Sequence, residues 1–75
     1  MPALSELTRG QKGVVATVQG ADGVTQRLME MGILDGEIVE LVGFAPLGDP
    51  LEIRVQDCNL SLRKTEAARV LVNLI

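Results

Sequence analysis

The sequence contains no histidine, tryptophan or tyrosine, and it has a single cysteine, Cys58, and a single phenylalanine, Phe44. The absence of histidine excludes a Ser-His-Asp or Cys-His catalytic centre and a Cys/His zinc site. One aromatic residue cannot line a groove for proline-rich peptides or supply the stacking platform of an RNA-binding barrel. With no candidate nucleophile, general base or metal site, we expect no enzymatic activity and no bound cofactor.

Basic charge is scarce as well. Ten acidic and seven basic residues give a net charge of −3 and a pI near 4.7, whereas nucleic-acid-binding proteins usually carry a basic face. The longest apolar stretches, such as Val70 to Val72, are far shorter than the roughly 18 residues that span a bilayer. The start of the chain lacks the pattern of a signal peptide, and the lone cysteine cannot form an internal disulfide. We therefore expect one soluble, cytoplasmic domain over residues 1–75, with no nucleic-acid partner and no direct membrane insertion.

What the chain has is aliphatic residues in strand-like patterns, separated by glycine and proline. A period of two predicts a strand over residues 12–19. Its inward face would carry Val14, Ala16 and Val18. A second strand is predicted over residues 37–44, but it is apolar on both faces, so its inward face stays open. Residues 45–50 contain two prolines and a glycine and predict a loop.

The second half of the chain predicts a hairpin and a final strand. Residues 51–55 alternate cleanly, and Gln56-Asp57 reads as a tight turn into the next strand. In that strand the inward face would consist of Cys58, Leu60 and Leu62, which makes Cys58 a buried, inert thiol. Thr65 is expected to cap a single helical turn that runs to Arg69, and residues 70–74 form the last strand.

Residues 22–31 predict the one longer helix. Asp22 is a suitable N-cap, and Gly32 stands where a left-handed residue ends a helix. The apolar stripe of this helix would consist of Val24, Leu28 and Met31. Arg27 and Glu30 are spaced to form a weak surface ion pair. About five short strands with one helix favour a mainly β fold, a small SH3-like barrel with the helix across an open end and a short helical turn near the C-terminus.

Residues 27–36, RLMEMGILDG, resemble the signature R-L-x-x-M-G-h-x-x-G, with h hydrophobic, of ferrous iron transport protein A, the FeoA family. Three further segments resemble the family in the same order and spacing: residues 4–13, 45–55 and 60–68. The resemblance implies an SH3-like cytoplasmic accessory protein of bacterial ferrous iron uptake. Its implied partner is the FeoB-type permease, a large membrane protein with a cytosolic G domain, whose assembly or activity it would modulate.

Two groups of residues are candidates for contacting that partner. Off the apolar stripe of the helix, the candidates are Arg27, Met29 and Glu30, and Ile33 just beyond the helix joins them. In the long loop, the candidates are Phe44, Ala45, Pro46 and Leu47. If both groups are exposed side by side, they form a small apolar cleft for a segment of the permease or for a second copy of this chain.

Two alternatives to the accessory role remain open from the sequence. The chain could be a self-associating structural subunit, or an iron sensor or chaperone that binds Fe²⁺ directly. A metal site is disfavoured because the carboxylates are scattered and no imidazole is present. Three arginines, Arg27, Arg54 and Arg63, could reach a phosphate group of a partner, although each is more simply a surface ion-pair residue.

Overall fold

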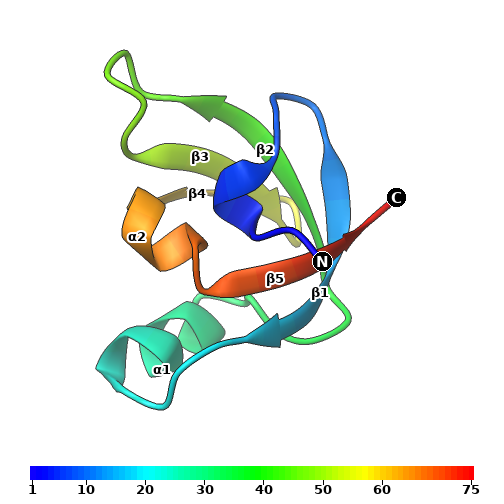
Figure 1. The fold of residues 1–75 in the computed structure, drawn as a ribbon, viewed down its shortest axis with the longest axis vertical. Coiled ribbons are helices and arrows are strands. Elements are labelled where there is room, and N and C mark those ends of the chain that lie inside the picture. The colour runs from blue at the N-terminus through cyan, green and yellow to red at the C-terminus, as the bar shows by residue number, and fades with distance from the viewer.

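In a computed structural model that describes residues 1–75, five strands form a strongly curved antiparallel sheet around one core, and two short helices pack beside it (Figure 1). The elements run in the order η1 (Leu4–Glu6), β1 (Lys12–Val18), α1 (Gly23–Glu30), β2 (Ile38–Phe44), β3 (Leu51–Val55), β4 (Cys58–Leu62), α2 (Lys64–Ala67) and β5 (Val70–Leu74). The strand order in the sheet is β4-β3-β2-β1-β5. The mainly β architecture predicted from the sequence is confirmed. None of the helices is long and apolar enough to cross a membrane.

Strand β1 buries a different face from the one predicted. Val15 and Val18 are buried, whereas Val14 and Ala16 are only half-buried. The cause is a bulge: the pairing of β1 with β5 shifts register between Val15 and Thr17. One extra residue at that point reverses the alternation of the side chains, so no single period of two describes the whole strand.

Strand β2 resolves the face that the sequence left open. Val39 and Leu41 are fully buried, while Ile38 is exposed and Val42 is half-buried. The register explains the choice, because Val39 lies opposite Val55 and Leu41 opposite Ile53, both of which are buried. The inward residues of β2 and β3 thus share one face of the sheet.

Helix α1 forms as predicted and is anchored at both ends. Asp22 is its N-cap, and its side chain accepts a hydrogen bond from the Thr25 amide at 3.2 Å. Gly32 has a φ of +99°, the left-handed conformation that ends the helix after Met31. Leu28 is fully buried. Thr25, which the sequence did not single out, is also buried, and its hydroxyl donates to the Gln19 carbonyl at 3.0 Å.

The prediction that Cys58 is buried is wrong. Cys58 lies opposite buried Val55 in the β3–β4 register, so its face is the expected one. However, β4 is an outer strand of the sheet, and burial falls along it from Leu62 through half-buried Leu60 to exposed Cys58. The beginning of the strand extends past the side chains that would cover it.

The short helix α2 begins two residues earlier than predicted. Its N-cap is Arg63 rather than Thr65, and the Arg63 amide donates to Oε1 of Glu66 at 2.9 Å. A carboxylate three residues into a helix can satisfy the N-cap amide in this way. This helix end is therefore capped by the side chain of Glu66 and not by a Ser, Thr or Asp side chain at the N-cap position, which is the signal used for the prediction.

Candidate docking surface

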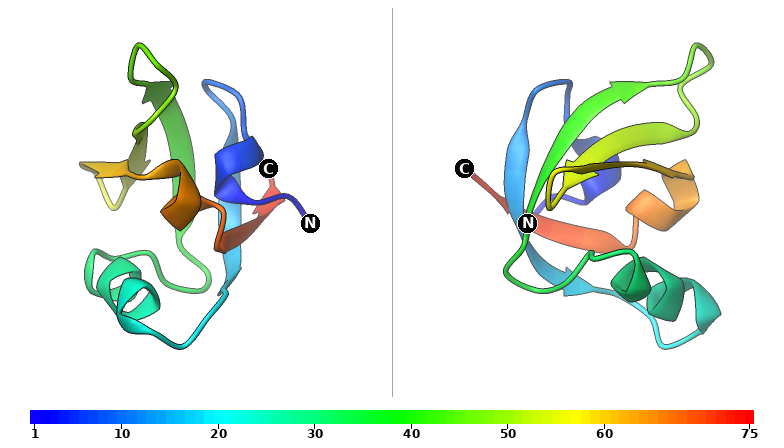
Figure 2. Two further views of the ribbon diagram at one scale, coloured as in Figure 1. Left: turned by 60° about the vertical axis from the view of Figure 1, so that its left-hand side comes forward. Right: turned by 180° about the vertical axis from the view of Figure 1, so that it is seen from behind.

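The two groups of predicted partner residues lie at opposite ends of the molecule. The loop of residues 45–50 forms the tip of the β2–β3 hairpin, and α1 lies across the other end of the barrel (Figures 1 and 2). They do not form the common apolar cleft that the sequence suggested as one outcome. A partner that touches both must span one face of the protein.

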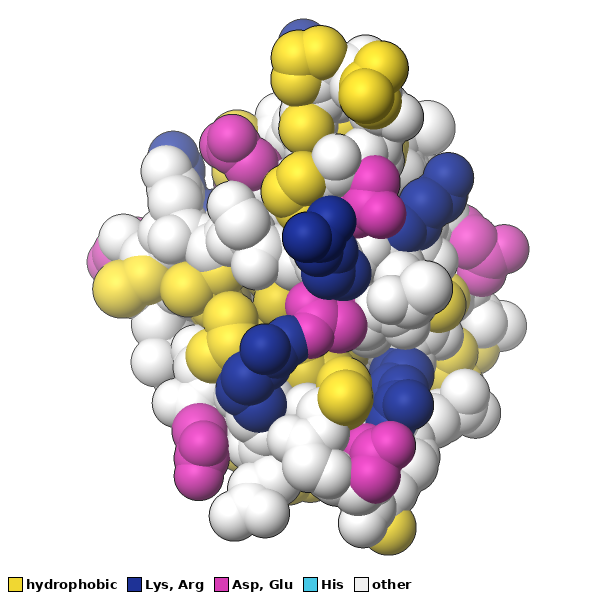
Figure 3. All heavy atoms as spheres, turned by 90° about the vertical axis from the view of Figure 1, so that its left-hand side faces the viewer, with side chains coloured by type: hydrophobic (Ala, Val, Ile, Leu, Met, Phe, Trp, Pro, Cys, Tyr) yellow, Lys and Arg dark blue, Asp and Glu magenta, His cyan; other side chains and the backbone are white.

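The 45–50 loop presents apolar side chains to solvent. Leu47 is 96% exposed and Phe44 is 39% exposed. The loop is closed by its own backbone, because the Ala45 amide donates to the Pro50 carbonyl at 3.0 Å and the Gly48 amide to the Ala45 carbonyl at 2.7 Å. Pro46 is exposed and Ala45 half-buried. These contacts hold Leu47 away from the core, and hydrophobic side chains cap this end of the molecule in Figure 3.

The candidate residues on α1 and just after it divide into exposed and buried ones. Met29 is 43% exposed, and Glu30 is exposed too. Ile33 is fully buried, so its predicted role in contacting a partner is wrong. After Gly32 the chain turns back on the helix, and the Ile33 amide donates to the Leu28 carbonyl at 3.1 Å. This turn directs the Ile33 side chain into the core rather than to the surface.

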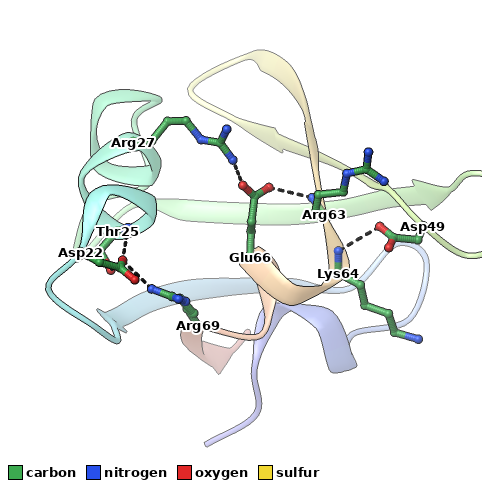
Figure 4. A network of polar contacts seen from close by, with 8 residues as sticks. All are labelled: Asp22, Thr25, Arg27, Asp49, Arg63, Lys64, Glu66 and Arg69. Carbon is green, nitrogen blue, oxygen red and sulfur yellow. Dashed lines mark hydrogen bonds and ion pairs between the residues drawn. The ribbon is translucent and has the colours of Figure 1, made fainter.

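Arg27 forms an ion pair with Glu66 of α2 and not with Glu30, which corrects the predicted local pair (Figure 4). Glu66 has two roles, since its carboxylate also accepts the Arg63 amide. Its side chain is 12% exposed, whereas that of Arg27 is 58% exposed. The pair joins two helices that are far apart in the sequence, so helical spacing alone could not identify it.

A second ion pair joins the start of α1 to the residue before β5. Nη1 of Arg69 lies 2.6 Å from Oδ1 of Asp22. The hydrogen bond from Arg69, together with that from the Thr25 amide, lowers the pKa of Asp22 to about 2, against a small opposing effect of burial. The Asp22 carboxylate therefore serves both as a helix cap and as an anchor for the end of the sheet.

The loop is also connected to α2. The Lys64 amide donates to Oδ1 of Asp49 at 3.0 Å, so the first turn of α2 contacts the base of the hydrophobic tip (Figure 4). Between this contact and α1 lies an open groove of about 340 Å³. Its walls consist of Arg27, Met31, Pro50, Ser61, Arg63 and Glu66. Of these, the sequence pointed to Arg27 as a partner-binding residue and to Arg63 as an arginine that could reach a phosphate group of a partner.

Arg63 differs from the other arginines considered in the sequence. Arg27 is paired with Glu66, and Nε of Arg54 donates to Oδ1 of Asn59 at 3.3 Å. The guanidinium of Arg63 makes no hydrogen bond or ion pair within the chain, and Figure 4 shows it directed away from Glu66. No three Cys, Asp or Glu side chains converge as a set of metal ligands.

Comparison with known proteins now identifies the family. The FeoA domain model matches residues 3–74, almost the whole chain. The chain belongs to the FeoA family. The likeness extends to a fusion of Fe(2+) transport protein A with the Fe(2+) transporter FeoB in Porphyromonas gingivalis, which is 42% identical over 72 residues. That alignment covers 96% of this chain but only 8% of the fusion protein.

Solved FeoA structures share the fold. The solution structure of FeoA from Chlorobium tepidum superposes with a TM-score of 0.90 at 36% identity, covering 97% of this chain and 70% of that chain. The crystal structure of FeoA from Stenotrophomonas maltophilia with zinc, an SH3 domain protein, gives a TM-score of 0.86 at 38% identity. It covers 97% of this chain and 91% of the other. The FeoA-family chain described here accordingly has the SH3-like fold predicted from the sequence.

Proposed function

We propose that this protein is an accessory factor of ferrous iron uptake that docks on a FeoB-type permease and modulates its assembly or activity. The observation that carries the proposal is the fusion of an FeoA domain and FeoB in one relative. Covalent fusion of two proteins in one organism favours physical association of their separate counterparts in another.

The 45–50 loop is the part of the surface best suited to this docking. An almost completely exposed leucine at the tip of a hairpin contributes nothing to the core, yet its burial against a partner would contribute about 1.5–3 kcal/mol. Phe44, the last residue of β2 and next to this loop, adds the only aromatic ring in the chain. A few side chains buried at the centre of an interface commonly supply most of its affinity.

A titration of the chain against the cytosolic part of its FeoB-type permease tests the proposal. Leu47→Glu should weaken binding at least tenfold, because it places a charge where the partner would bury an apolar group. Ile75→Glu is the matched control, since Ile75 is also an exposed aliphatic residue and its replacement changes the charge equally. That variant should bind like the wild type.

The two alternative functions, self-association and direct binding of Fe²⁺, predict different results for the same proteins. A wild-type chain that does not bind the intact permease or its cytosolic part would refute the proposal. Self-association through the loop would appear in sedimentation as an oligomer that Leu47→Glu dissociates, with no effect on permease binding. Saturable uptake of Fe²⁺ by the isolated chain in anaerobic calorimetry would instead favour an iron sensor or chaperone.

A further inference from the structure

We infer that the groove between α1 and α2 receives an acidic segment of the permease, with the guanidinium of Arg63 as the group that binds its carboxylate. The inference rests on the proposed function and names the chemistry of the partner segment. It adds a second contact beside the apolar loop. It also gives a role to an arginine that the internal structure of the protein does not use.

The distribution of charge supports an acidic partner segment. The residues that line the groove include two basic ones, Arg27 and Arg63, and one acidic one, Glu66. The rest of the chain therefore holds five basic and nine acidic residues. A chain with a net charge of −3 repels an acidic peptide over most of its surface, but much less at this groove. Electrostatic complementarity of this kind selects partners and increases association rates.

The state of the two arginines in the groove indicates which one acts. Arg27 already has a carboxylate partner in Glu66, so an incoming anion would have to compete for it. Arg63 has none, although guanidinium groups readily bind carboxylates through two parallel hydrogen bonds. The backbone amide of Arg63 donates a hydrogen bond to Oε1 of Glu66 at 2.9 Å. This hydrogen bond holds the backbone from which the free guanidinium extends.

The shape of the groove fits a peptide better than an isolated ion. Met31 and Pro50 contribute apolar wall beside the charged groups, and Ser61 contributes a hydroxyl from the outer strand β4. Pro50 is also the last residue of the 45–50 loop, whose tip carries Leu47. A segment with a carboxylate in the groove and an apolar residue beside Leu47 would cover one continuous face, where Figure 3 shows mixed charges beneath a hydrophobic end.

Charge substitutions with opposite expected effects test the inference, again by titration against the cytosolic part of the permease. Arg63→Glu should weaken binding tenfold or more, because it replaces the carboxylate receptor by a like charge. Glu66→Gln should strengthen binding at least threefold. It keeps an oxygen for the Arg63 amide while removing the carboxylate that competes for Arg27. A purely structural role of Glu66 would give no increase.

Arg54→Glu is the matched control. It makes the same change of charge at another arginine in the chain, one that lies outside the groove, and it should alter affinity less than twofold. Raising the salt concentration from 50 to 300 mM should weaken the wild type more than Arg63→Glu. Circular dichroism of each variant establishes that it is folded before the titration.

Each result has one meaning. If Leu47→Glu abolishes binding while Arg63→Glu stays within twofold of the wild type, the groove inference is overturned and the proposed function stands. If the wild type does not bind, both fall. If Arg63→Glu dissociates a self-associated form of the chain and leaves permease affinity unchanged, the occupant is a second copy, and the inference of an acidic permease segment is wrong.

Discussion

Replacing Ile33 by alanine tests whether this residue belongs to the core of the protein or to its candidate docking surface. The side chain is fully buried, so the substitution removes three carbon atoms from close-packed surroundings and leaves a cavity. The lost transfer free energy is about 0.8 kcal/mol for each buried methylene, and the cavity adds to it. We expect a loss of about 3 kcal/mol in the free energy of unfolding, within the roughly 2–5 kcal/mol range of such changes.

That loss is large for a chain of 75 residues. Domains are stable by roughly 0.05–0.15 kcal/mol per residue, which gives about 4–11 kcal/mol in total. A change of 1 kcal/mol shifts the melting temperature of a domain this size by about 4–8 °C. Ile33→Ala should therefore lower the melting temperature by roughly 12–24 °C, and the variant should remain folded at low temperature.

Far-UV circular dichroism is the appropriate assay, because the chain has no tryptophan or tyrosine for fluorescence. Urea and thermal unfolding should be followed for the wild type, Ile33→Ala and Leu47→Ala. Leu47 touches little in the free protein, so its replacement should change stability by no more than about 0.5 kcal/mol. A loss below about 1 kcal/mol for Ile33→Ala would refute the placement of Ile33 in the core and return it to the candidate surface residues.

Three further changes test other features of the fold. Asp22→Asn keeps a capping side chain but removes the ion pair with Arg69. Because that pair, together with the hydrogen bond from the Thr25 amide, lowers the folded-state pKa of Asp22 from 3.8 to about 2, its contribution is present above pH 4 and lost as the pH falls toward 2. The stability gap between wild type and variant in urea unfolding should therefore close over that range. Gly13→Ala should destabilise the protein by about 1–3 kcal/mol in thermal melts, since the new Cβ would lie 2.9 Å from Cβ of Val72. Cys58 should react with a thiol reagent in the native state, at a rate close to that in urea, because it is exposed.

The controls for these changes lie in the same chain. Gly23→Ala introduces a methyl group with nothing within 4 Å, so it should not reproduce the effect of Gly13→Ala. If it does, glycine flexibility rather than close packing explains the loss. A gap for Asp22→Asn that persists at pH 2 would show that the cap, not the pair with Arg69, is responsible. Labelling of Cys58 only after unfolding would contradict its exposure.

The features that the sequence predicts correctly depend on neighbouring residues. The cap at Asp22, the left-handed Gly32 and the turn at Gln56-Asp57, whose φ angles are +53° and +63°, are all local. Each follows from the chemistry of a few consecutive side chains. These signals place the elements and their order along the chain with bounds close to those observed.

The features that sequence reasoning missed depend on residues far apart in the chain. The inverted face of β1 results from a bulge against β5, and the partner of Arg27 is a residue of α2 rather than Glu30. Exposure of Cys58 follows from the place of β4 at the end of the sheet. The groove escaped notice for the same reason, because its walls come from α1, the end of a loop, β4 and α2.

The ends of the chain bear on how a fused and a separate FeoA domain differ. The N-terminal residues pair with β5, where the Val72 amide donates to the Pro2 carbonyl at 2.9 Å, and both ends lie on the side away from α2 (Figure 2). A linker attached at either end therefore leaves the groove and the 45–50 loop uncovered. Tethering raises the effective concentration of a docking domain to about the millimolar range for short flexible linkers. An FeoA domain fused to its permease can therefore stay docked through weak contacts. An untethered FeoA domain needs a higher affinity, matched to its cellular concentration, and it can dissociate from the permease.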